Sequence, residues 1–194
     1  MKLVAGLLAA GALTGMIAPN VSREQAAAFQ KKLDGIIQHS EAPTEASRQT
    51  DVSESEVNSY LHFSAGDKIP VGVTEPSITI QAQGRLHGRA VVDLDLVRRK
   101  KSSGSWFDPL SYLTGRLPLT ASGVLQTHDG RGRFTLESAA ISGIPIPKTF
   151  LQEIVSYYSR TPDYPNGVRI DDPFDLPADI KKIDVQPGKA TIVQ

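Results

Sequence analysis

The sequence predicts an α+β fold in which a long, curved antiparallel β-sheet wraps against one or two helices. Between residues 78 and 140, apolar and polar residues alternate with a period of two over long stretches, as in strands with one buried face. A helical period replaces this alternation over residues 22–38 and 147–159. A sheet with one apolar face must be covered by helices, by its own curvature or by a ligand.

The composition limits the class of protein. A chain of 194 residues suits one domain with a targeting segment and a tether. Its 21 basic and 21 acidic residues leave a formal net charge of zero. Nucleic acid is therefore not an expected partner, because non-specific binding to it needs an excess of basic residues. The absence of cysteine excludes disulfides, thiolate metal sites and cysteine nucleophiles.

Residues 1–21 are predicted to be a signal peptide or an N-terminal anchor. Lys2 precedes an uncharged apolar run over residues 3–18. A run of roughly 16 residues fits a secretory leader better than a spanning helix, which needs about 20. Pro19 makes the cleavage site poor, so an uncleaved anchor is the alternative. We expect an exported protein, periplasmic or extracellular.

Residues 22–50 are predicted to form a helix and a polar linker. Ser22 suits the N-cap, with Gln25 at the capping-box position. One stripe of this helix is apolar and comprises Phe29, Leu33, Ile36 and Ile37. The polar segment over residues 39–50 is the expected linker. The helix could pack on the domain or space it from a membrane.

The remaining residues, 51–194, are predicted to form the curved-sheet domain. A capping box at residues 53–56 opens a short helix. Alternation then predicts one pair of strands over residues 78–96 and another over residues 117–140, with a turn at residues 128–132. Pro147 suits the first turn of the next helix. A hairpin around Pro187 and Gly188 closes the chain.

No catalytic or metal-binding motif is visible. The four histidines, His39, His62, His87 and His128, lack ligand spacing. Asp93 and Asp95 share one face of a predicted strand, which is typical of solvated surface as well as of acid–base pairs. We interpret them as surface residues and Asp171-Asp172 as a turn. The sequence therefore predicts a protein that is not an enzyme and has no cofactor or metal. A hydrolase with dispersed catalytic residues is the less favoured alternative.

A basic cluster adjoins an aromatic, loop-like segment over residues 103–115. The cluster consists of Arg98, Arg99, Lys100 and Lys101, and the apolar residues after it are Trp106, Phe107, Leu110, Tyr112 and Leu113. Such a combination favours peripheral contact with an anionic membrane, where rings settle among the headgroups and cations are attracted. Two other interpretations remain: the cations form a solvated hairpin tip, and the aromatic residues plug the core of the domain.

Two motifs resemble those of a known superfamily. Residues 53–61, Ser-Glu-Ser-Glu-Val-Asn-Ser-Tyr-Leu, resemble an S-E-x-E-x-N-x-Y-L start found in exported bacterial proteins, and a hairpin with Ile78-Thr-Ile and Leu86 follows. Residues 141–147, Ile-Ser-Gly-Ile-Pro-Ile-Pro, resemble a later G-x-P-x-P turn. These proteins are similar to bacterial relatives of the tubular lipid-binding (TULIP) superfamily. The resemblance covers about residues 53–194 and implies a curved sheet around a helix, with lipid binding in place of catalysis. Asn58 matches the early Asn of this start, and we interpret it as a structural residue.

Together these observations predict an exported protein that binds a lipid or another apolar ligand. The expected ligand-binding residues are Trp106, Phe107, Leu110, Tyr112, Leu113, Ile144, Ile146, Phe150, Ile154 and Tyr158. Residues 98–101 are the expected membrane contact. The alternative is a structural or protein-interaction domain of the cell envelope, in which the sheet is filled by its own side chains.

Overall fold

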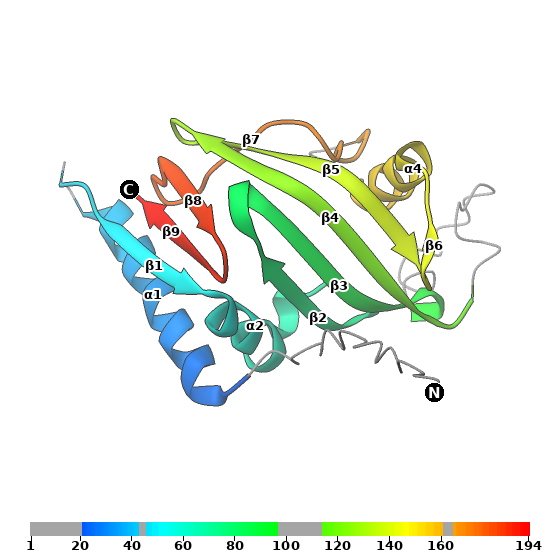
Figure 1. The fold of residues 1–194 in the computed structure, drawn as a ribbon, viewed down its shortest axis with the longest axis horizontal. Helices are drawn as coiled ribbons and strands as arrows, with labels where there is room; N and C mark the ends of the chain where they lie inside the picture. The colour runs from blue at the N-terminus through cyan, green and yellow to red at the C-terminus, as the bar shows by residue number, and fades with distance from the viewer. Residues whose placement is uncertain (1–20, 43–45, 97–113, 161–164) are drawn as a thin grey trace, which may run out of the picture.

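The computed structural model describes residues 21–42, 46–96, 114–160 and 165–194. The expected signal peptide or anchor therefore lies almost entirely outside the described residues. The general class is confirmed: the chain is α+β, with a large antiparallel sheet and a few helices (Figure 1).

The described strands form two antiparallel sheets. The larger sheet has six strands, and β7 and β6 both pair with its strand β5. In chain order its members are β2 (Val73–Ile80), β3 (Arg85–Asp93), β4 (Arg116–His128), β5 (Arg131–Ile141), β6 (Ile144–Pro145) and β7 (Phe174–Asp175). The smaller sheet has the order β1-β9-β8, formed by β1 (Gln49–Ser53), β9 (Lys189–Val193) and β8 (Lys182–Gln186). The α-helices are α1 (Arg23–Glu41), α2 (Glu54–Phe63) and α4 (Lys148–Tyr158), and two short 3-10 helices are η1 (Gly66–Lys68) and η2 (Ala82–Gly84).

The main hydrophobic core lies between α1, α2 and the smaller sheet. These elements occupy one end of the molecule, whereas α4 lies at the other end of the larger sheet (Figure 1). The rings of Phe29 on α1 and Tyr60 on α2 meet edge to face, with centroids 5.2 Å apart. The buried core residues are Phe29, Ile36, Val52, Tyr60, Ala65, Ile180, Ala190 and Ile192. The first helix thus packs on the domain.

Side chains of α2 hold the free edge of β2. The Asn58 amide donates to Ile78 O and accepts from Ile78 N, both at 2.8 Å. Glu54 accepts from the amide of Ile80 at 2.7 Å. The capping box predicted at residues 53–56 is present in full. This short helix therefore takes the place of a neighbouring strand, which closes an edge that would otherwise pair with other chains.

Three element boundaries differ from the sequence-based prediction. The helix α1 runs to Glu41, and β1 begins at Gln49, inside the segment expected to be a linker. The pattern of β1 is polar, and its only described strand partner, β9, lies at the far end of the sequence. The strand β2 begins at Val73, before residue 78, because an irregularity between Thr74 and Ser77 interrupts the alternation.

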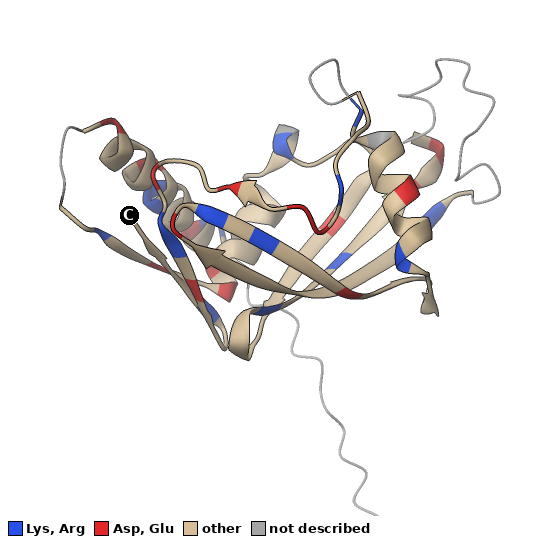
Figure 2. Ribbon diagram, turned by 90° about the horizontal axis from the view of Figure 1, so that it is seen from above, with Lys and Arg blue, Asp and Glu red and all other residues tan. Residues whose placement is uncertain are grey.

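The predicted strand pairs, the helix after Pro147 and the closing hairpin are confirmed, with one further difference in bounds. The strand β3 ends at Asp93, and residues 94–96 form a helical turn where the alternation predicted strand. Pro147 itself occupies the N-cap of α4. Basic and acidic residues are interspersed along the strands (Figure 2).

Candidate functional site

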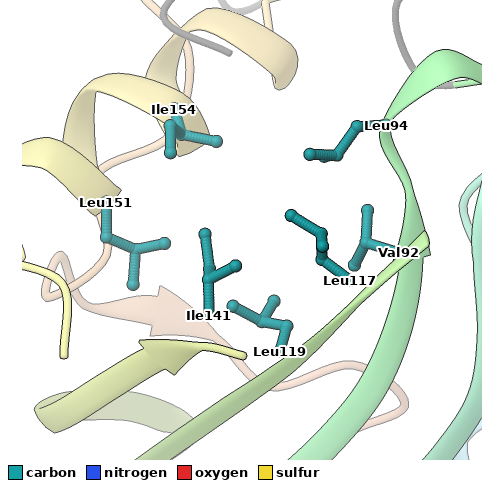
Figure 3. A pocket seen from close by; sticks show the side chains of 7 residues that line it. All are labelled: Val92, Leu94, Leu117, Leu119, Ile141, Leu151 and Ile154. Atoms are coloured by element: carbon teal, nitrogen blue, oxygen red, sulfur yellow. The ribbon is translucent and has the colours of Figure 1, made fainter. Parts of the chain in front are cut away.

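An apolar hollow of about 70 Å³ lies between α4 and the larger sheet (Figure 3). Its described wall consists of seven aliphatic side chains that point toward one another from the sheet and from the helix. They are Val92, Leu94, Leu117, Leu119, Ile141, Leu151 and Ile154. A wall of this composition offers dispersion contacts and no hydrogen bonds, so it favours an apolar occupant.

The strand register builds the floor of the hollow. Val92 pairs with Leu117, and Leu119 pairs with Ile141, on one face of the sheet. Leu94 follows β3 directly, is only 4% exposed, and donates its amide to Gly115 O at 3.0 Å. The floor is therefore fixed by the backbone ladder of three neighbouring strands.

Beside this floor, the same face of the sheet carries small side chains. Gly88 pairs with Ala121, which in turn pairs with Ala139. Ala121 is two residues from Leu119, and Ala139 is two residues from Ile141, so both lie on the face that carries the hollow. Gly88, opposite Ala121, lies on the same face. These three residues are not part of the described wall, and Ala139 is buried.

Helix α4 forms the roof. Leu151 and Ile154 are three residues apart, so they lie on one face of the helix and reach into the hollow. Of the α4 side chains that the structure describes, none is fully buried. The helix thus contacts the sheet along part of its apolar stripe only.

The predicted ligand-binding residues occupy different places. Ile154 lines the hollow. Ile146 and Phe150 are half-buried, but neither is part of the wall. Ile144 is 70% exposed, because it belongs to a two-residue edge strand that follows a tight turn. The side chain of Tyr158 and the predicted contacts at 98–101, 106, 107, 110, 112 and 113 lie outside the described residues.

Sequence reasoning missed most of the wall. Val92, Leu94, Leu117 and Leu119 are visible in the sequence as the apolar positions of alternating strands. Alternation assigns such residues to one face of a strand, but it does not give the register that places them opposite α4. The helical period likewise marks Leu151 as apolar without distinguishing it from Phe150 as the residue that faces the sheet.

The charged and polar residues of the described chain give little support to a catalytic site. No cluster of three or more metal-ligating side chains occurs in the described residues. The two carboxylates considered as an acid–base pair instead bind backbone amides: Asp93 accepts from Leu96 N at 3.0 Å, and Asp95 from Gly115 N at 3.1 Å. His87 contacts Ser122 Oγ at 2.7 Å, but this pair lies on the face of the sheet opposite to the hollow.

The pKa shifts also lie away from the hollow. The Lys148 ammonium and the Leu136 amide hold the pKa of Asp171 below its usual value. The hydrogen bonds from Arg85 do the same for the pKa of Glu137. Both carboxylates are engaged with a cation at the surface, which is typical of structural ion pairs.

The sequence matches no family model, and no curated protein matches it. Among the helices of the described residues, none is both long enough and apolar enough to cross a bilayer.

Proposed function

We propose that this protein is an exported, non-catalytic binding protein for a lipid or another apolar ligand, and a relative of the TULIP superfamily. The observation that carries the proposal is the hollow under α4, whose seven described wall residues are all aliphatic. Sites for apolar ligands are concave and lined mainly by hydrophobic side chains. Burial of a hydrocarbon chain here would remove apolar surface of both partners from water.

The apolar segment at residues 3–18 would direct export or anchor the chain, and residues 98–101 with the aromatic residues after them would touch an anionic membrane. These two segments suit a protein that exchanges its ligand with a bilayer, because both attract it to the surface from which a lipid is taken.

The small size of the hollow favours a second candidate function, that of a structural or protein-interaction domain. About 70 Å³ is well below the roughly 300 Å³ at which pockets for drug-sized ligands begin. A domain whose sheet is filled by its own side chains would act in the cell envelope as a structural or protein-interaction module.

Native mass spectrometry of the purified chain, with organic extraction of any bound molecule, tests the proposal. We expect a stoichiometric lipid or other apolar compound, either co-purified or taken up from liposomes. An unliganded mass before and after incubation with liposomes would contradict ligand binding and favour the envelope module.

A substitution in α4 tests whether the ligand occupies the hollow. Leu151→Asn keeps the approximate size of the side chain but places an amide in the aliphatic wall, where it lacks a hydrogen-bond partner. We expect at least a tenfold loss of ligand occupancy in the same mass spectra. Glu153→Gln is the matched control, because Glu153 lies on the same helix and is exposed. Equal occupancy in both variants would place the ligand elsewhere.

A further inference from the structure

The polar side of α4 is bound to the segment at residues 168–171, here named the strap. Gln152 donates to Val168 O at 3.1 Å and accepts from Ile170 N at 2.8 Å. Ser159 Oγ accepts from Val168 N at 2.7 Å, and Lys148 pairs with Asp171. Helix and strap are therefore joined by several hydrogen bonds and an ion pair, and they form one unit.

Among the described residues, the strand pairings that connect this unit to the larger sheet lie on the outer edge of β5. On one side, β6 pairs with Ala140 and Ile141. On the other side, β7 pairs with Arg131 and Gly132. Both connecting strands are only two residues long. Between these two strands, two described hydrogen bonds join the unit and its connection to β5. Asp171 accepts from Leu136 N at 3.2 Å, and Ile146, which connects β6 to α4, donates its amide to Ala139 O at 2.9 Å.

The apolar contacts of the unit are those that a ligand would replace. Leu151 and Ile154 line the hollow from the side of the helix, and its volume of about 70 Å³ is too small for most ligands. Lifting the unit would enlarge the hollow and would keep every bond between α4 and the strap. Among the described contacts, the losses would include the Asp171–Leu136 bond and the aliphatic contacts, and a bound hydrocarbon would restore the latter.

We propose that α4 and the strap form a lid over the hollow, attached through β6 and β7 and latched by the hydrogen bond between Asp171 and the Leu136 amide. The inference rests on the proposed function for its purpose, since the lid would regulate entry to the ligand site. The motion of this lid can be tested without any ligand.

The absence of native cysteine allows a direct measurement of lid opening. Leu94→Cys places one thiol on a buried wall residue that faces Ile154 across the hollow (Figure 3). Its alkylation rate with N-ethylmaleimide, measured by mass spectrometry, reports exposure of the hollow. Ala190→Cys, at a buried position in the core of the other end, is the matched control for global unfolding.

The latch is then removed in each single-cysteine chain. We expect Asp171→Ala to accelerate alkylation of Cys at position 94 several-fold and to leave the rate at position 190 unchanged. Asp171→Asn retains a side-chain oxygen for the Leu136 amide, so we expect the parent rate at both positions.

Three results would overturn the lid or its latch. An unchanged rate at position 94 in Asp171→Ala would show that this residue does not hold the unit closed. Equal acceleration at both positions would mean global destabilisation. Equal acceleration by Asn and Ala would assign the effect to the Lys148 ion pair. Failure of the proposed function is separate, because it appears as an unliganded mass spectrum whatever the alkylation rates are.

Discussion

A buried amide is one of the contacts that join α2 to the larger sheet. Asn58 is 2% exposed, and its side chain satisfies both backbone groups of Ile78 on the edge of the larger sheet. An amide suits this task because it carries a donor and an acceptor side by side, as a neighbouring strand does. These contacts join Asn58 to the backbone of β2.

We expect Asn58→Asp to lower the free energy of unfolding by about 1–3 kcal/mol, the usual cost of leaving a buried polar group without its partner. One carboxylate oxygen can still accept from Ile78 N, but the other would oppose Ile78 O. Urea denaturation measures the change. Asn166→Asp is the control, since Asn166 is exposed. Equal midpoints for the two variants would contradict the role assigned to Asn58.

The helix α2 begins with an ionic cap that also binds α1. Partial burial raises the pKa of Glu56, but hydrogen bonds from Lys32 and from the Ser53 amide, each 2.8 Å long, outweigh it and leave the pKa below its ordinary value. The carboxylate is therefore more stable in the folded chain than in the unfolded one. Its contribution links the start of α2 to the middle of α1.

This cap gives the stability of the fold a defined pH dependence. Because the folded pKa of Glu56 is lowered, its contribution is present above the unfolded value of about 4.3 and is lost as the pH falls through the folded pKa. We expect Glu56→Gln to cost about 1 kcal/mol at pH 7 and progressively less below pH ~4. Chemical denaturation at several pH values measures the difference. The exposed Glu153→Gln variant is the control, and a cost for Glu56→Gln that is unchanged at low pH would refute the argument.

Elements with a strong local pattern could be predicted, whereas those defined by distant partners could not. The capping box, the alternating strands and the hairpin around Pro187 and Gly188 are local, and each is present. The strand β1 is short and polar, and it depends on β9, which pairs with it from about 140 residues away. Similarly, the strap is visible in the sequence only as a turn at Asp171-Asp172.

The same distinction applies to the candidate site. Helical spacing placed Ile154 among the expected ligand contacts, and it lines the hollow. Ile144 has the same apolar character, but the edge strand turns it outward. Register and edge position are tertiary properties, so the sequence predicts which residues are apolar more reliably than which of them converge.

At the level of the whole molecule, stability and the proposed function are separated in space. The main core lies with α1, α2 and the smaller sheet, whereas the hollow lies under α4 at the other end (Figure 1). The wall residues of the hollow do not belong to this main core, although Leu94 is itself buried. Variants at the hollow should therefore be compared with variants in the main core, so that effects on binding can be distinguished from effects on stability.

The aromatic segment after the basic cluster provides the last test. If Trp106 and Phe107 contact a membrane, replacing both with Ser should weaken binding to liposomes that contain phosphatidylglycerol by about tenfold, because aromatic rings contribute strongly at the headgroup level. The thermal midpoint should change little. Phe174→Ser is the control, because it removes a ring that is 45% exposed on β7. A large fall in the midpoint with unchanged liposome binding would instead assign Trp106 and Phe107 to the core of the domain.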